Sequence, residues 1–145
     1  IHQLCNCFLI RNPRDVAKSF LKSWSEGDFI DMGFSQQALI FDLVCNKNNK
    51  IAPVIDADLL RSDPERVLRK LCKEIDISWD NKMLEWDSGI KDNDGIWAEH
   101  WYPSVKTSTF FKPLSENKDV ILSDNEERIA QEAMPFYEKL LKHAL

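Results

Sequence analysis

A short apolar run that leads directly into a capped helix, near the N-terminus, constrains the fold of this chain more than any other feature. Phe8–Ile10 lacks polar alternation and is typical of a strand buried on both faces of a parallel sheet. Asn12 is a favourable N-cap, and Pro13 suits the first helical position because its missing N–H would be unpaired there. Apolar residues then recur at helical spacing, namely Val16, Ala17, Phe20, Leu21 and Trp24. The junction predicts a strand followed by a helix whose apolar stripe packs on the sheet.

The next segments repeat the strand and helix signals. Apolar spacing over residues 34–45 predicts a second helix that ends in the polar turn 46–50. Residues 51–55 predict a second strand, and a third helix is expected to begin at Pro64, capped by Asp63. This order of elements indicates an α/β fold, in which a parallel sheet is flanked by helices.

The C-terminal segment from Ser123 predicts a final helix that begins with a capping box and packs back on the sheet. Pro135 lies inside its apolar pattern and is expected to kink the helix or to split it near Ala133. We expect residues 1–145 to form a single domain that contains a loop-rich aromatic segment at 81–122.

Composition restricts the partners. The net charge is −5 and no basic run occurs, which argues against a nucleic-acid partner. No apolar run approaches the ~18 residues of a membrane span, and no signal peptide is recognisable, so we expect a cytoplasmic protein without a membrane partner. The four cysteines contain no Cys-x-x-Cys pair, which predicts reduced, mostly buried thiols and no metal site.

Arg11 and Ser19 are candidate ligands of a phosphate group. A guanidinium presents a planar fork of donors, a hydroxyl adds one more, and helix N-termini favour anions. The alternative is structural, because an arginine after a strand commonly pairs with a carboxylate and a helical serine is commonly solvated. Since parallel crossovers are right-handed, we expect Arg11 and Asp56, which follow the two strands, on one side of the sheet.

The string Arg-Asn-Pro-Arg-Asp-Val-Ala-Lys-Ser, from Arg11 to Ser19, closely resembles the 3′-phosphate-binding motif of the P-loop sulfotransferases. These enzymes transfer a sulfuryl group from 3′-phosphoadenosine 5′-phosphosulfate (PAPS). The resemblance implies a P-loop NTPase-like fold, a 3′-phosphate held by Arg11 and Ser19, no metal, and a hydroxyl or amine acceptor. Residues 54–64, with the amphipathic helix that follows them, are similar to the family's next strand, acidic turn and helix, and residues 95–102 to a segment of bacterial and fungal sulfotransferase-like proteins.

The family's other hallmarks are not recognisable in this sequence. None of the four glycines opens a P-loop pattern, and His2 is too close to Arg11 to be the family's catalytic histidine. The tyrosine that touches adenine in the family would fall near Ala57. We therefore expect the C-terminal part of a sulfotransferase-like domain, incomplete at its N-terminus, that is inactive alone. Its other half would come from the rest of the protein or from another copy in a homo-oligomer.

Asp56 and Asp58 support a different hypothesis. A carboxylate at the end of an apolar strand can hold magnesium through water, as in P-loop kinases. These aspartates can instead cap the following turn, which is common at such positions. A third possibility is a non-catalytic interaction domain derived from a sulfotransferase.

The aromatic segment holds the candidate acceptor residues. Trp97, Trp101 and Tyr102 could form the walls of a pocket for a small-molecule or glycan acceptor. His100 could act as a base on an acceptor hydroxyl, because its ordinary pKa lies near neutrality. The alternative is a small satellite core in which His100 is simply hydrogen-bonded.

Overall fold

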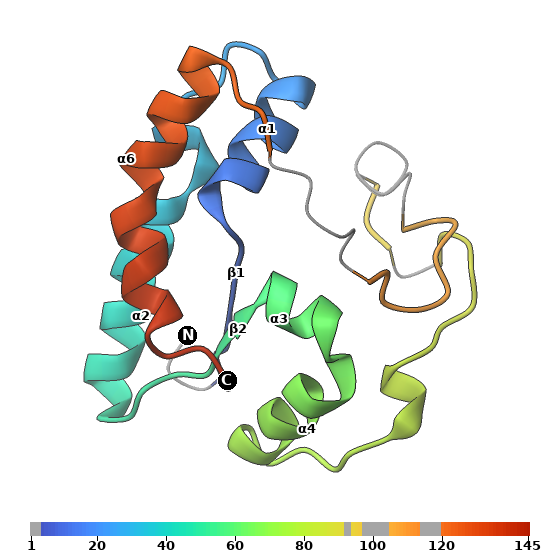
Figure 1. Cartoon of the computed structure of the whole chain (residues 1–145). Coiled ribbons are helices and arrows are strands. Elements are labelled where there is room, and N and C mark those ends of the chain that lie inside the picture. Colours follow the sequence, from blue (N-terminus) through green and yellow to red (C-terminus); the bar gives the residue numbers. More distant parts are fainter. Residues whose placement is uncertain (1–3, 92–93, 97–104, 114–119) are drawn as a thin grey trace.

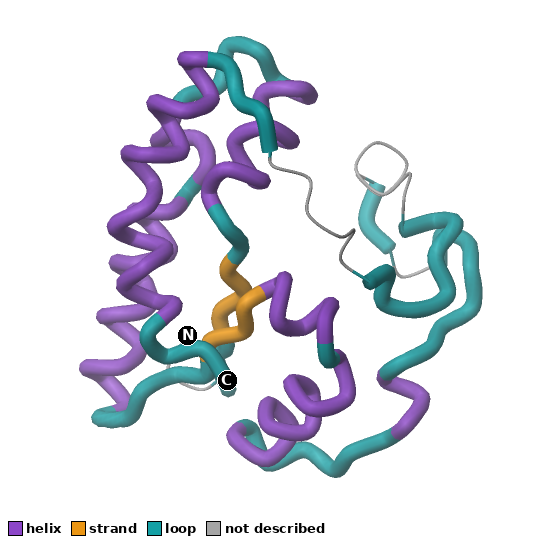
Figure 2. The backbone as a smooth tube through the Cα atoms, in the orientation of Figure 1, coloured by secondary structure: helices purple, strands orange, loops and turns teal. Residues whose placement is uncertain are grey.

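A parallel pair of strands lies at the centre of the computed structural model, which describes residues 4–91, 94–96, 105–113 and 120–145 (Figure 1). β1 (Phe8–Ile10) pairs with β2 (Val54–Asp56), and the register places Ile10 opposite Asp56. Helices flank this sheet, so the α/β prediction is confirmed (Figure 2). Because Ile10 faces Asp56, Arg11 leaves β1 at the edge where β2 ends, as the crossover argument predicts.

α1 (Pro13–Ser23) begins where the sequence predicts. The Asn12 side chain accepts a backbone N–H of the first turn at 3.0 Å, and Pro13 is the first helical residue. The expected partner of its apolar stripe is wrong, because α1 packs on α6 (Asp124–Leu141) and not on the sheet. Ala17 is buried in one cluster with Ile129 and Ala130 of that helix, and the two helices lie side by side in Figure 1.

η1 (Phe29–Met32) and α2 (Phe34–Asn48) meet at Gly33, whose φ of 75° is left-handed. α2 continues through most of the expected polar turn at 46–50 and ends at Asn48, where its cap residue Asn49 also has a positive φ. The predicted end was early because asparagine tolerates the left-handed cap, so polar residues can extend the helix up to it.

β2 and the helices after it differ in part from the expected strand at 51–55. The strand begins only at Val54, because Pro53 has no N–H to donate to a ladder. α3 (Ala57–Ser62), which the sequence did not indicate, follows β2 directly. α4 (Pro64–Glu74) is capped by Asp63, as predicted.

One face of the sheet is covered by α2 and α6, as Figure 2 shows. The main core cluster unites apolar side chains of the strands, α2 and α6, among them Phe8, Ile10, Phe41, Val54 and Leu140. The capping box at Ser123 and the packing of α6 on the sheet are confirmed. The expected split near Ala133 is wrong: α6 is continuous through Pro135, because buried residues on both sides of the proline hold it in place.

The described part of residues 81–122 contains η2 (Asn81–Met83) and an isolated antiparallel bridge between Glu85 and Phe110. Arg61 of α3 donates to the carbonyls of Lys112 and Pro113, at 3.0 and 3.2 Å. These bonds connect the 81–122 segment to the helix that follows β2. No helix within the described ranges is long and apolar enough to cross a membrane.

The cysteine prediction is only partly correct. All four thiols are free, and Cys72 is buried in α4. Cys5 and Cys7 are exposed, which contradicts the expectation of mostly buried thiols, because they precede β1 and lie outside the core.

Candidate functional site

Arg11 lies immediately after β1, where both strands end. Its side chain is 42% exposed, and its Nε lies 4.0 Å from Oδ2 of Asp15, one helical turn further along. It also lines a cavity of about 400 Å³ together with residues of β1, α1 and α2. The structural alternative, a carboxylate partner, is therefore present in Asp15, but an exposed pair at this distance contributes little. The guanidinium remains accessible to an anion.

Ser19 is exposed on α1, and its carbonyl accepts the hydroxyl of Ser23 at 3.4 Å. Arg11, Asp15 and Ser19 are spaced four residues apart. Asp15 and Ser19 lie at i and i+4 of α1 and share a face of the helix, whereas Arg11 precedes the N-cap Asn12 and contacts Asp15 at the start of that face. That Arg11 and Ser19 hold one phosphate stays a prediction.

Asp56 is a buried anchor at the same edge. It is 4% exposed, and both of its carboxylate oxygens are occupied. Oδ1 accepts the backbone N–H groups of Asp58 and Leu59 at 2.9 and 3.0 Å, which confirms that Asp56 caps the following turn. Oδ2 accepts the Tyr137 hydroxyl at 2.9 Å. Burial and this carboxylate raise the pKa of Tyr137 above its ordinary value, so the hydroxyl remains a donor.

Asp58, which follows β2, has a buried carboxylate oxygen, Oδ1, that lacks a hydrogen-bond partner in the described residues. Burial raises the pKa of Asp58, and the negative charges of Asp56 and Asp15 raise it further, against the weaker effect of Arg11 and Arg61. Two carboxylates, those of Asp15 and Asp58, therefore interact with the charge of the candidate phosphate arginine. Both would oppose an anionic ligand at Arg11.

The acceptor-side residues cannot be placed in this site. The predicted base His100 and the predicted walls Trp97, Trp101 and Tyr102 lie outside the described residues, so their roles stay predictions. Sequence reasoning missed Tyr137, whose place within the apolar stripe of α6 could have indicated a buried hydroxyl in need of a partner. Within the described ranges, no three His, Cys, Asp or Glu side chains gather as a metal-ligand set.

Comparison with known proteins agrees with the motif. Residues 3–144 match the family described as "Sulfotransferase domain", so the chain belongs to that family. It is 36% identical over 136 residues to "Branched-chain-amino-acid aminotransferase-like protein 1" of Arabidopsis thaliana, which covers 93% of this chain and 24% of the relative.

A second relative from the same plant, "Branched-chain-amino-acid aminotransferase-like protein 2", is 38% identical over 103 residues. That match covers 71% of this chain and 18% of the relative. The chain thus spans about a quarter or less of the curated relatives that it matches. No solved structure matches it.

Proposed function

We propose that this chain is the 3′-phosphate-binding part of a sulfotransferase that uses PAPS, and that Arg11 and Ser19 hold the 3′-phosphate. The observation that carries the proposal is the exposed guanidinium of Arg11 at the end of β1, directly before α1, in a chain of the sulfotransferase domain family. We further propose that the two strands belong to a P-loop NTPase-like sheet.

The residues fit the nucleotide's phosphate in charge and donor type. Arg11 would donate hydrogen bonds from its planar fork to two phosphate oxygens, and the Ser19 hydroxyl would donate a further bond. Asp15 would release Arg11 as the phosphate arrives. PAPS would supply the activated sulfuryl group, and a hydroxyl or amine of a small-molecule or glycan acceptor would receive it. The chain's own contribution is to position the nucleotide, and positioning supplies much of the rate of such transfers.

The kinase-like alternative is less well supported. Asp56 already accepts three hydrogen bonds, so a magnesium-bound water at this strand end would have to replace one of them. This chain matches only a quarter or less of each plant relative, so the aminotransferase-like name of those proteins does not bear on its function. The proposal rests on the family match and on Arg11.

Calorimetric titration tests the proposal. We expect 3′-phosphoadenosine 5′-phosphate to bind without metal, and Arg11→Ala to weaken binding about 10- to 100-fold, the value of a charge-assisted bond. Lys22→Ala is the matched control, because it removes an exposed cation from the last turn of the same helix and should leave the affinity unchanged.

The other outcomes identify the competing functions. Binding of ADP that requires magnesium would support a kinase-like site. A folded sample that binds neither nucleotide would support a non-catalytic interaction domain. Circular dichroism of each variant shows whether the sample is folded.

A further inference from the structure

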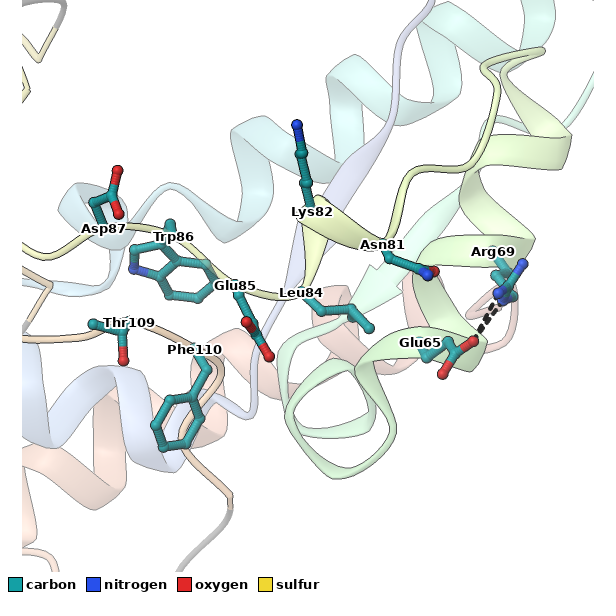
Figure 3. A pocket seen from close by; sticks show the side chains of 10 residues that line it. All are labelled: Glu65, Arg69, Asn81, Lys82, Leu84, Glu85, Trp86, Asp87, Thr109 and Phe110. Atoms are coloured by element: carbon teal, nitrogen blue, oxygen red, sulfur yellow. Dashed lines mark hydrogen bonds and ion pairs between the residues drawn. The ribbon is translucent and has the colours of Figure 1, made fainter.

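A second cavity lies away from Arg11, between α4 and two stretches of the 81–122 segment, residues 81–87 and 109–110. Its volume is about 1090 Å³, more than twice that of the cavity beside Arg11, and Figure 3 shows the side chains that line it. Pockets for small molecules commonly occupy about 300–1,000 Å³. The cavity is therefore large enough for an organic ligand.

Its aromatic wall is fixed in place before any ligand arrives. The Trp86 indole N–H donates to Oγ of Ser108 at 3.1 Å, and the Trp86 backbone N–H donates to the Thr109 carbonyl at 2.9 Å. The Trp86 ring also packs edge-on against Phe111. Phe110, in the bridge with Glu85, is 55% exposed. A rigid wall loses little entropy on binding, which favours ligand recognition.

Two cations line this cavity: Arg69 is already paired with other side chains, and Lys82 points away from the aromatic wall. Arg69 pairs with Glu65 at 2.8 Å, and its guanidinium lies 4.4 Å from the centre of the Trp79 ring. The Lys82 side chain points away from Trp86 and Glu85 in Figure 3. These cations therefore do not neutralise the acidic groups beside the indole.

The uncompensated charge of the cavity is negative. Glu85 and Asp87 flank Trp86 in the sequence, both line the cavity, and neither has an ion pair within the part of the chain that the structure describes. Figure 3 shows Glu85 between Leu84 and Phe110, so its carboxylate lies next to apolar surface, whereas the Asp87 carboxylate points to the other side of Trp86. A cationic head group next to an indole gains both Coulomb and cation–π attraction.

We propose that this cavity binds an organic ammonium ion, with its cationic head near Glu85 and its apolar body against Trp86 and Phe110. An anionic ligand would meet the unpaired carboxylate of Glu85. A small inorganic cation would leave the aromatic wall uncovered. The inference is independent of the nucleotide site, because the two cavities share no lining residue among those described.

Three probes with one ring and different head groups test it: benzyltrimethylammonium, benzyl alcohol and phenylacetate. The readout is the indole N–H resonance of Trp86 in two-dimensional NMR, assigned with Trp86→Phe. We expect saturable shifts with the cation at a Kd of about 1 mM, which matches a few weak contacts, and weaker or absent shifts with the other two probes.

Charge variants complete the test. Glu85→Gln should weaken cation binding about three- to tenfold, and Asp87→Asn should weaken it less, because the Asp87 carboxylate points to the other side of Trp86. Glu26→Gln, which removes an exposed carboxylate outside the cavity, should not weaken it. Phenylacetate that binds as well as the cation, cation binding that Glu85→Gln leaves unchanged, or no saturable shift would overturn the proposal. Affinity for 3′-phosphoadenosine 5′-phosphate should be equal in all of these variants, so failure here is distinct from failure at Arg11.

Discussion

Tyr137→Phe probes the contact that joins the C-terminal helix to the edge of the sheet. The substitution keeps the ring and removes only the hydroxyl that donates to Asp56 at 2.9 Å. Asp56 is 4% exposed, so water cannot readily replace the lost donor. A hydrogen bond to a charged group contributes about 1.5–3 kcal/mol, and we therefore expect the free energy of unfolding to fall by about 2 kcal/mol.

Urea denaturation at pH 7, followed by circular dichroism, measures this change. Ser35→Ala is a suitable control, because it removes an exposed hydroxyl of α2 and should alter the free energy by less than about 0.5 kcal/mol. In an Asp56→Asn background the cost of Tyr137→Phe should shrink, because the charged acceptor is gone. If Tyr137→Phe lowers the free energy of unfolding no more than Ser35→Ala does, the Tyr137–Asp56 hydrogen bond does not stabilise the fold as argued.

Three further outcomes follow from the same geometry. Asp15→Asn should strengthen binding of 3′-phosphoadenosine 5′-phosphate about two- to fivefold in calorimetry, because it frees Arg11 and removes a charge that repels phosphate. Asp58→Asn should stabilise the fold in urea at pH 7, and the gain should vanish near pH 3. The raised pKa of Asp58 means that wild-type stability falls as pH rises from its ordinary value of 3.8 through the folded-state value. Gly33→Ala should cost about 1 kcal/mol in thermal or urea unfolding, because φ at this position is 75°.

Helix starts could be predicted from the sequence because their chemistry is local. Asn12 with Pro13, and Asp63 with Pro64, cap the helices that they were expected to cap. The parallel pairing of the strands also follows from the order of elements, and with it the position of Arg11 at the edge where Asp56 ends.

Contacts between distant segments could not be predicted in the same way. The amphipathic pattern of α1 shows that one face is buried, but not that α6 covers it in place of the sheet. The Tyr137–Asp56 bond joins residues 81 positions apart. The unpartnered oxygen of Asp58 depends on how tightly α3 packs beside β2, which residue types do not specify.

The candidate phosphate site could be predicted from the sequence only in part. The spacing of four residues places Asp15 and Ser19 on one face of α1, which can be read from the sequence. The charge interaction between Arg11 and Asp58 is a tertiary effect. The sequence therefore indicates candidate ligands of a phosphate but not the second carboxylate that acts on Arg11.

The most direct test of the account compares two nucleotides that differ only in the 3′-phosphate. Calorimetry should show that 3′-phosphoadenosine 5′-phosphate binds the wild-type chain at least about tenfold more tightly than adenosine 5′-phosphate, the value of one charge-assisted contact. In Arg11→Ala the two affinities should become nearly equal. If the wild type does not distinguish the nucleotides, or if the same preference persists in Arg11→Ala, Arg11 is not the ligand of the 3′-phosphate.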